Sequence, residues 1–495
     1  MQLPLSTLDI PRAPEEASLA PAARIYSSRN LRLDQIEMIG FDMDYTLAIY
    51  NQEGMDRLSI EATVQKLVLE RGYPESLLSM DYRIDFPIRG LLVDKKYGNI
   101  LKMDRYKYVK KAYHGLHPLD TETRRKLYHA QQIKPATSRY HWVDTLYALS
   151  EVSVYAATVE ELERRGMEVN YEKLFTDVRE CIDLSHQDGS ILDKVLADLP
   201  KYVVRDPKLG PTLHKLRSSG KRLFLLTNSR AGYTNEMMKY LLDGSVPGYP
   251  SWKNFFEYTI TASKKPRFFD TPTNFRRVND DGTETEVETL ERGGVYAGGN
   301  LLDFERIAGV DADRILYVGD HIFGDVLRAK KETAWRTAMI IQEMSAELEA
   351  LHRSAADSAR LDSLTDLRGT LHHDLRVQQE RLKRIMKSLD SHKETNGGSV
   401  PPEVEADRVK TRKTVEKLRA QIKVTETEMN EIEERIDRAF HPFWGSLFKA
   451  GPETSSFGNQ VEMYACVYMD RVSNLLDYSP YHYFRSPRDR MPHET

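Results

Sequence analysis

The sequence predicts an α/β protein built on a doubly wound parallel β-sheet, with a domain inserted into the sheet and a long helical hairpin toward its C-terminus. Short apolar runs recur along the chain, as buried parallel strands require. Helical patterns lie between several of these runs, which gives the alternation of strand and helix that builds such a sheet. About 180 residues separate the first run from the second, far more than a crossover helix needs, so this excess predicts the inserted domain.

The elements follow in order along the chain. Strands are predicted at residues 36–41, 221–226, 258–262, 314–318 and 336–341. Helices are predicted at 231–243 and 323–332, where apolar residues recur at helical spacing. After the third strand, "FRRVNDDGTETEVE" has a turn centre flanked by alternating residues, which is typical of a β-hairpin.

The region from about 344 to 440 is charged and helix-forming, and it is interrupted once, at "TNGGSVPPE". Two long helices that fold back on each other explain this pattern most simply. The apolar residues would form a packed stripe between the helices and the charges a solvated face. The alternative is that the hairpin forms a contact between subunits.

These patterns divide the chain into five parts. We expect a flexible N-terminal tail (1–30), a core (31–54 and 201–343), an inserted cap domain (55–200), the helical hairpin (344–440), and an aromatic-rich C-terminal segment that packs on the core (441–495).

Composition narrows the classes of protein. The 495 residues carry a formal net charge of −4, so no nucleic-acid or membrane-surface partner is required. Cys181 and Cys466 are too few for a disulfide framework, which fits a reducing compartment. The N-terminus lacks the pattern of a signal peptide, and no apolar run is long enough to span a bilayer. We expect a cytoplasmic protein.

Polar side chains of particular kinds follow four of the predicted strands. Because ligands bind at the carboxyl ends of strands in open α/β sheets, these side chains should converge. They are Asp42 and Asp44 after the first strand, Thr227 to Ser229 ("TNS") after the second, Lys264 and Lys265 after the third, and Asp320 and Asp325 ("GDHIFGD") after the fourth. This set predicts a site for metal-assisted phosphoryl transfer.

Phosphoryl transfer needs each of these residue types for a physical reason. Crowded carboxylates need a hard cation, and oxygen ligands favour Mg²⁺ over zinc. Asp42 is suited to attack phosphorus and form an aspartyl phosphate, while Asp44 would protonate the leaving group and later deprotonate water. Lys265 and the hydroxyl of Thr227 would offset charge on the phosphoryl oxygens.

Each motif alone has a simpler alternative. Asp42 and Asp44 could form an ordinary turn or cap, "TNS" consists of common helix N-cap residues, and Lys265 could be a solvated loop lysine. The arrival of all four motifs at strand ends, in sequence, favours a catalytic site over these alternatives.

The strings "DMDYTLA", "TNS", "KKPRFF" and "GDHIFGD" resemble the haloacid dehalogenase (HAD) superfamily, and specifically its cytosolic purine 5′-nucleotidase family of the type that prefers IMP and GMP. Further family-like strings, such as "FPIRGLLVDKKYGNILKMD" and "KYVVRDPKLGPTL", extend the resemblance over nearly the whole chain. The resemblance implies a HAD-like core with a cap, and Mg²⁺ as the cofactor.

The same resemblance implies roles for individual residues. Asp42 would be the nucleophile and Asp44 the general acid and base, with Asp42, the main-chain carbonyl of Asp44 and Asp320 around Mg²⁺. Thr227 and Lys265 would hold the phosphate. The supporting residues would be Asp325, Asn228 and Ser229.

Substrate residues transfer less directly. The family stacks an aromatic residue on the purine and reads its edge with an Arg and an Asp. Here these would be Tyr147, Arg179 and Asp183, with His186 nearby. Arg179 and Asp183 lie four apart on one helix face, so an ordinary helix ion pair is the alternative. Ala148 and Gln187 depart from the family pattern, which leaves the base preference open.

An effector site between subunits is also implied by the resemblance. Lys331, Arg336 and Gln460 fit its pattern, whereas Lys134 and Met463 each replace an arginine. A phosphate site without bidentate arginine should bind more weakly, so strong activation by ATP is not expected.

The resulting function is Mg²⁺-dependent hydrolysis of purine nucleoside 5′-monophosphates, with a nucleoside able to intercept the aspartyl phosphate in place of water. The resemblance also implies a homo-oligomer, either a dimer or a tetramer. Two alternatives stay open: a HAD phosphatase for another small phosphate ester, and a scaffold protein that acts through the helical hairpin.

Overall fold

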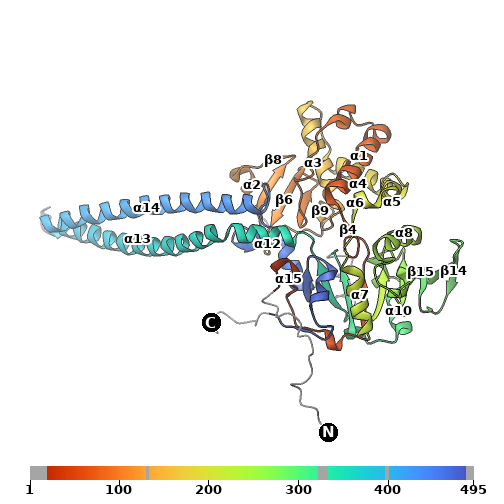
Figure 1. Ribbon diagram of the computed structural model, residues 1–495. Coiled ribbons are helices and arrows are strands. Elements are labelled where there is room, and N and C mark those ends of the chain that lie inside the picture. Colours follow the sequence, from red (N-terminus) through yellow and green to blue (C-terminus); the bar gives the residue numbers. More distant parts are fainter. Residues whose placement is uncertain (1–18, 130–132, 322–332, 396–400, 487–495) are drawn as a thin grey trace, which may run out of the picture. The chain divides into compact units, whose positions relative to one another are not determined.

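The computed structural model describes residues 19–129, 133–321, 333–395 and 401–486. The chain divides into two compact units, Met1–Ser345 with Leu447–Thr495 and Ala346–Ser446. Figure 1 labels several elements of each unit. The expected helix at 323–332 lies outside the described residues.

A ten-stranded sheet forms the centre of the first unit. Strands β20 to β15 in its spatial order are all parallel, and the chain leaves β3 toward β11 but returns to β16 on the other side of β3. This reversal is the topological switch point of a doubly wound sheet. In spatial order the strands are β1 (Tyr26–Ser27), β20 (Val467–Met469), β17 (Arg336–Ile340), β16 (Ile315–Gly319), β3 (Met38–Phe41), β11 (Arg222–Leu226), β12 (Tyr258–Thr261), β15 (Gly294–Gly298), β13 (Phe275–Val278) and β14 (Glu284–Val287).

The central strand β3 is buried along its whole length, because neighbouring strands and side chains enclose it. A Cβ atom at Gly40 would lie 2.1 Å from the ring of Phe224 on β11, so only glycine lets this ring pack against β3. Phe224 belongs to an aromatic core cluster with Phe304, Tyr317 and Trp335. This packing makes β3 a rigid support for the residues that follow it.

The five strands predicted from sequence are confirmed, as are the helix at 231–243 and the β-hairpin, which is β13 and β14. The hairpin continues the main sheet, because β13 pairs with β15. Strands β15 and β20 were missed, since their short runs carry glycine or lie in the aromatic C-terminal segment.

The tail expected at 1–30 needs correction. Residues 26 and 27 form the edge strand β1, which pairs with β20, and the ring of Tyr26 stacks on that of Tyr468 at 5.5 Å. This stacking and pairing hold a segment whose Pro- and Ala-rich composition had suggested a flexible tail.

Five helices of the described residues in the first unit accompany the main sheet: α7 (Leu209–Ser218), α8 (Ala231–Leu242), α9 (Arg267–Asp270), α10 (Leu301–Ala308) and α15 (Ser456–Tyr464). The boundary between the two units falls within α12 (Met344–Arg353). Helix α10 shows how local sequence sets helix ends. The side chain of Asn300 accepts from the amide of Asp303 at its N-terminus, and Gly309 adopts φ 62° after its last turn. Among the described residues, no helix combines the length and apolar character that crossing a bilayer requires.

The segment between β3 and β11 carries its own sheet, in which all neighbouring strands are antiparallel. In spatial order these strands are β8 (His117–Pro118), β7 (Val109–His114), β6 (Asn99–Met103), β5 (Leu91–Asp94) and β9 (Tyr140–Val143). Its helices are α1 (Gln52–Arg71), α2 (Thr121–Tyr128), α3 (Ala148–Arg164), α4 (Tyr171–Gln187), α5 (Leu192–Ala197) and α6 (Leu199–Tyr202).

A short antiparallel ribbon marks where the chain enters and leaves this segment. Strand β4 (Ile49–Tyr50) pairs with β10 (Val203–Val204), with Tyr50 opposite Val203. The ribbon lies directly before α1 and directly after α6. We call it the linker ribbon.

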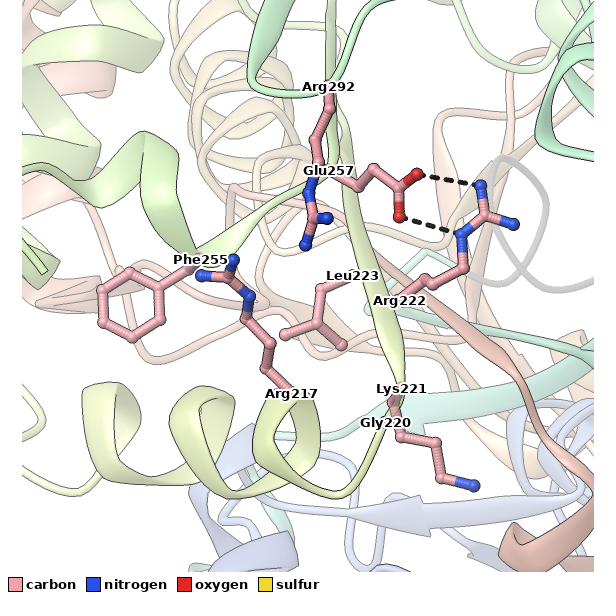
Figure 2. A pocket seen from close by; sticks show the side chains of 8 residues that line it. All are labelled: Arg217, Gly220, Lys221, Arg222, Leu223, Phe255, Glu257 and Arg292. Atoms are coloured by element: carbon pink, nitrogen blue, oxygen red, sulfur yellow. Dashed lines mark hydrogen bonds and ion pairs between the residues drawn. The ribbon is translucent and has the colours of Figure 1, made fainter.

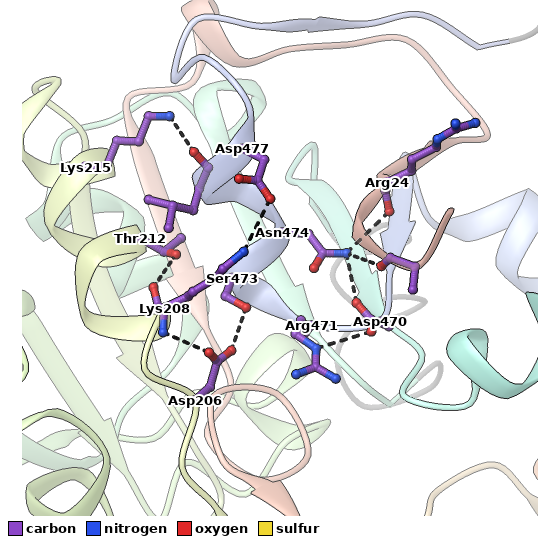
Figure 3. A network of polar contacts seen from close by, with 12 residues as sticks. Arg24, Asp206, Lys208, Thr212, Lys215, Asp470, Arg471, Ser473, Asn474 and Asp477 are labelled. Atoms are coloured by element: carbon purple, nitrogen blue, oxygen red, sulfur yellow. Dashed lines mark hydrogen bonds and ion pairs between the residues drawn. The ribbon is translucent and has the colours of Figure 1, made fainter. Parts of the chain in front are cut away.

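A polar network joins the start of the described chain to the C-terminal segment (Figure 3). The amide of Asn474 donates to the carbonyl of Ala22 and to Asp470, at 2.9 and 2.8 Å. Ser473 donates to Asp206, close to the start of α7, at 2.6 Å. Asn474 and Ser473 belong to the 3₁₀ helix Val472–Asp477, which is therefore tied to two distant parts of the chain.

The second unit contains α13 (Ala355–Thr395) and α14 (Pro402–Phe440), which run side by side (Figure 1). A helix of this length spans about 60 Å. Leu364, Met429 and Ile432 form part of the buried stripe between them. The predicted helical hairpin is confirmed, except that its first ten residues form the separate helix α12. Ser354 follows α12 and bonds back to the carbonyl of Ala350 at 2.8 Å.

One buried carboxylate makes stability depend on pH. Asp56 on α1 is 5% exposed, and its carboxylate accepts from Gln52. Burial raises the pKa of Asp56 to about 7. Because the pKa is higher in the folded than in the unfolded chain, the stability that the protonated group contributes is lost as pH rises toward 7.

Asp56→Asn removes the ionisable group and keeps an acceptor for Gln52. We expect the thermal midpoint of the variant to rise relative to the wild type as pH increases from 4 to 8, with a stability gain of up to about 4 kcal/mol at the upper end. Thermal unfolding followed by circular dichroism measures this. If the difference in midpoint between the variant and the wild type does not change with pH, Asp56 is not the group that makes stability depend on pH.

Candidate active site

Four neighbouring strands bring the candidate residues together. Strands β16, β3, β11 and β12 are adjacent and parallel, so their carboxyl ends meet at one edge of the sheet. Asp42 follows β3, Thr227 follows β11, Lys265 lies in the loop after β12, and Asp320 follows β16. The amide of Asp42 donates to the carbonyl of Val318 at 2.9 Å, which extends the β3–β16 ladder to this edge.

Asp42 and Lys265 form a buried ion pair. The Nζ atom of Lys265 lies 2.9 Å from Oδ1 of Asp42, and the two side chains are 3% and 12% exposed. The amide of Met43 donates to the same oxygen at 2.8 Å. The alternative that Lys265 is a solvated loop lysine is therefore wrong, because the charge is buried and paired.

Further contacts fix the position of Lys265. Its Nζ donates to the hydroxyl of Tyr317 at 2.7 Å, and that hydroxyl donates to the carbonyl of Leu226 at 3.0 Å. Asn228 accepts from the amide of Lys265 at 2.6 Å and donates to its carbonyl at 3.0 Å. The lysine is thus held at both its backbone and its ammonium group.

Asp44 occupies a different environment from Asp42. Its Oδ1 accepts from the hydroxyl of Tyr50 at 2.5 Å and its Oδ2 from the hydroxyl of Ser229 at 2.6 Å. Burial raises the pKa of Asp44, although both hydroxyls and the nearby Lys265 act in the opposite direction. Two carboxylates in such different surroundings can take different protonation states and different roles.

The "TNS" residues do not cap a helix. Helix α8 begins at Ala231, its N-cap residue is Arg230, and no side chain caps it. Thr227 is fully buried, and its hydroxyl oxygen accepts from the amide of Ser229 at 3.1 Å. Thr227, Asn228 and Ser229 instead line the edge of the sheet beside Asp44 and Lys265.

Asp320 is held from the inserted segment. Its main-chain carbonyl accepts from Nη1 of Arg89 at 2.9 Å. The side chain of Arg89 is fully buried and pairs with both carboxylate oxygens of Glu343, at 2.8 and 2.6 Å. The next residue, His321, lies 3.1 Å from the carboxylate of Asp144 through its Nε2.

The donor set at this edge fits a hard divalent cation. Asp42 and Asp320 offer carboxylate oxygens, and the main chain of Asp44 offers a carbonyl. Within the described ranges, no group of three His, Cys, Asp or Glu side chains forms a closed metal site. Mg²⁺ characteristically binds through one or two carboxylates and keeps several waters, so two carboxylates are enough.

Two of the expected base-binding residues lie together. The ring of Tyr147 meets the ring of His186 edge-on at 5.3 Å and that of Tyr45 at 4.7 Å. Tyr45 directly follows Asp44 in the chain. The rings of Tyr45, Tyr147 and His186 therefore form a continuous row. It leads from the carboxyl edge of the sheet, beside Asp44, to α3 and α4.

Arg179 does not form the helix ion pair that was the alternative for it. Its Nη1 lies 3.3 Å from Oε2 of Glu151 and 3.0 Å from Nε2 of His141. Glu151 is 4% exposed, its Oε1 has no hydrogen-bond partner among the described residues, and burial raises its pKa to about 7. Burial lowers the pKa of His141 to about 4. Asp183 is exposed on α4, one turn after Arg179.

Two expected residues, Asp325 and Lys331, lie outside the described residues. Of the other expected effector residues, Arg336 is exposed at the start of β17 and Gln460 is buried in α15. The effector site stays a prediction.

A basic pocket lies at the opposite edge of the sheet, beside the start of β11 (Figure 2). It has a volume of about 180 Å³ and is lined by Arg217, Lys221, Arg222 and Arg292, among others. Arg222 pairs with both carboxylate oxygens of Glu257, at 2.8 and 3.0 Å. None of the candidate catalytic residues lines this pocket.

A comparison of the sequence with known protein families identifies the family of this chain. The model of the 5′ nucleotidase family matches residues 25–495. The chain belongs to the 5′ nucleotidase family. The predicted resemblance is thereby confirmed, and the protein is a 5′-nucleotidase by class, a hydrolase of phosphoric monoesters.

Two curated relatives share the family. A 5′-nucleotidase domain-containing protein of Dictyostelium discoideum is 28% identical over 478 residues, which cover 95% of this chain and 74% of the relative. The 5′-nucleotidase domain-containing protein 2 of Rattus norvegicus is 27% identical over 497 residues, covering 97% and 82%.

Solved structures with some similarity include two phosphatases. A predicted phosphoglycolate phosphatase from Haemophilus somnus is 12% identical, covers 62% of this chain and 85% of its own, and has a TM-score of 0.27. A HAD phosphatase from Thermococcus onnurineus is 16% identical, covers 62% and 87%, and has a TM-score of 0.25. These scores are low, so the description of the fold depends on the strand order.

Three side chains that contact the candidate site were not predicted from the sequence. Tyr50 and Tyr317 stand in strand-like runs, where an aromatic residue is normally interpreted as core. Arg89 lies 254 residues from its partner Glu343, and no local pattern links them. The string "YVGD" could have pointed to Tyr317, because this tyrosine stands three residues before Asp320.

Tyr317→Phe tests how far Lys265 depends on its hydroxyl partner. We expect phosphate release to fall about fivefold, because the ammonium group loses one of its fixed contacts. The matched control is Tyr296→Phe, since Tyr296 is equally buried and bonds the main chain of Glu291. Equal losses of activity in the two variants would show that the effect is general destabilisation.

Proposed function

We propose that the protein is a Mg²⁺-dependent 5′-nucleotidase that hydrolyses purine nucleoside 5′-monophosphates of the IMP and GMP type through an aspartyl phosphate. The observation that carries this proposal is the contrast between two acids two residues apart. Asp42 is paired with the ammonium group of Lys265, whereas Asp44 is half-buried and lies between two hydroxyls. Nucleophile and proton donor need this difference.

The reaction would proceed in two displacements. A carboxylate oxygen of Asp42 forms a bond to phosphorus, the bond to the nucleoside 5′-oxygen breaks, and Asp44 gives its proton to that oxygen. Asp44 then takes a proton from water, the water oxygen bonds to phosphorus, and the bond to Asp42 breaks. Burial of Asp44 favours the protonated form that the first step needs.

The remaining residues would bind the phosphate. Lys265 and the hydroxyl of Thr227 would offset its charge, while Asn228 keeps the lysine in place. Asp42, Asp320 and the carbonyl of Asp44 would hold Mg²⁺. When bound, the cation would lower the repulsion between the phosphate and the carboxylates.

The base would lie against Tyr147 and His186, with Arg179 and Asp183 toward its edge. A 6-oxopurine presents an acceptor, O6, beside a donor, N1–H. The guanidinium of Arg179 and the carboxylate of Glu151, whose own hydrogen bond is 3.3 Å long, would present a donor beside an acceptor to the base. This complementarity favours hypoxanthine and guanine over adenine, whose pattern is reversed at these positions.

Several finer statements belong to the same proposal. A nucleoside would compete with water for the aspartyl phosphate, which gives phosphotransferase activity. The two described cysteines are both free and buried, which supports a cytoplasmic setting. The homo-oligomer is proposed from the family resemblance, and light scattering would measure it.

The first experiment measures phosphate release from IMP, GMP, AMP and ribose 5-phosphate, with and without Mg²⁺. We expect release from IMP and GMP that requires Mg²⁺ and falls about a thousandfold or more in Asp42→Asn. Asp311→Asn is the control, because Asp311 is exposed and precedes a distant 3₁₀ helix.

Activity that survives in Asp42→Asn would show that the nucleophile is wrongly assigned. Better turnover of ribose 5-phosphate would favour the phosphatase alternative. No release from any ester would favour a scaffold function.

Arg179→Ala tests base recognition. We expect kcat/KM for IMP to fall about 10- to 100-fold, because a charged hydrogen bond to the base is lost. The value for ribose 5-phosphate, which has no base, should hardly change. Arg164→Ala is a control on α3, since Arg164 is exposed and pairs with Glu161. Equal losses on both substrates would exclude a role in base recognition.

A further inference from the structure

The hydroxyl of Tyr50 links the proposed acid and base to a second tyrosine. It donates to Oδ1 of Asp44 at 2.5 Å and lies 2.9 Å from the hydroxyl of Tyr233 on α8. Tyr50 is 3% exposed and Tyr233 is 7% exposed. Because the hydroxyl of Tyr50 donates to Asp44, Tyr233 is the donor in the second bond. Such a chain strengthens the bond to the carboxylate.

Tyr50 belongs to the linker ribbon rather than to the main sheet. It lies opposite Val203 in the β4–β10 pair, and the amide of the next residue, Asn51, donates to the carbonyl of Tyr202 at 2.8 Å. Helix α1 of the inserted segment begins at Gln52. The position of the Tyr50 hydroxyl therefore depends on where this ribbon lies relative to β3.

The carboxylate of Asp44 is held from two sides. Tyr50 bonds one oxygen from the linker ribbon, and Ser229 bonds the other from the end of β11 at 2.6 Å. Two bonds to different oxygens fix both the rotation of the carboxylate about its χ torsions and its distance from β3. Without Tyr50, the bond from Ser229 alone would leave the group free to rotate.

The neighbouring charged and titratable groups do not replace this contact. Those that act on Asp44 or face it are Lys265 after β12, Tyr45 beside it in the chain, Tyr147 at α3, Tyr233 on α8, and Asp42 and Asp320 at the neighbouring strand ends. Among the hydrogen bonds that the structure gives to the side chain of Asp44, only those of Tyr50 and Ser229 fix it directly.

We infer that Tyr50 is a positioning residue: its hydrogen bond orients the carboxyl group of Asp44 toward the leaving oxygen. Through Tyr50, this orientation depends on the position of the linker ribbon. The inference rests on the proposed function, because it takes Asp44 as the proton donor to the leaving group. Tyr50 itself would act through Asp44, to which its hydroxyl donates.

Two substrates whose leaving groups differ in their need for a proton test this inference. A nucleoside 5′-oxygen needs a proton as it leaves, whereas p-nitrophenolate leaves without one. For Tyr50→Phe we expect kcat/KM for IMP to fall about tenfold and kcat/KM for p-nitrophenyl phosphate to change less than twofold, since this parameter reports the first displacement.

Two further variants make the test specific. Tyr240→Phe is the matched control, because the hydroxyl of Tyr240 reaches the same ribbon at the carbonyl of Val203, 3.4 Å away, without a bond to Asp44. It should affect both substrates equally or not at all. Tyr233→Phe removes the second hydroxyl of the chain, and we expect a loss of about two- to threefold that is again confined to IMP.

The outcomes separate this inference from the proposed function. If the wild type releases phosphate from neither IMP nor p-nitrophenyl phosphate, the proposed function fails. If the wild type is active and Tyr50→Phe slows both substrates equally, or neither, the positioning role is excluded. Should Tyr50→Phe not fold, the same comparison made with Tyr233→Phe decides, and equal effects on both substrates would overturn the inference.

Discussion

The site depends on one constraint, which is that a carboxylate removed from water must be paired or hydrogen-bonded. Several acids meet at the carboxyl edge of the sheet, and each has a specific partner. Asp42 has the ammonium group of Lys265, Asp44 has two hydroxyls, and Glu343 has the buried guanidinium of Arg89. Because removal of one member would leave a buried charge, these pairs constrain the loops that carry them.

This constraint also explains why distant parts of the chain meet here. The partners of the acids come from β4, from the segment before β5, and from the residues after β11 and β12. Arg89 reaches the carbonyl of Asp320 from within the inserted segment. The inserted segment is therefore joined to the carboxyl edge of the sheet by polar contacts as well as by the linker ribbon, so that its folding and the assembly of the candidate site are linked.

Sequence alone predicted the parts of the site that follow from topology. Parallel strands end at the same edge, so Asp42, Thr227, Lys265 and Asp320 had to converge once the strands were recognised. The helical hairpin followed equally from its long apolar stripe. What could not be predicted are contacts set by side-chain packing across the fold. The bonds from Tyr50 to Asp44 and from Tyr317 to Lys265 use hydroxyls of residues that resemble core aromatics. Strand β20 was missed because its three residues carry too short a pattern.

The β13–β14 hairpin has a consequence for contacts between copies of the chain. A sheet of parallel strands that ended at β15 would expose unpaired main-chain groups along a fully apolar strand. Instead β13 covers β15, and the outermost strand β14 is largely exposed and carries Glu284 and Glu286. Glu284 pairs with Arg276 of β13. A second copy that paired along β14 would have to pack against these charged side chains, which is unfavourable. The charged outermost strand β14 thus discourages the strand-to-strand aggregation to which open sheets are prone.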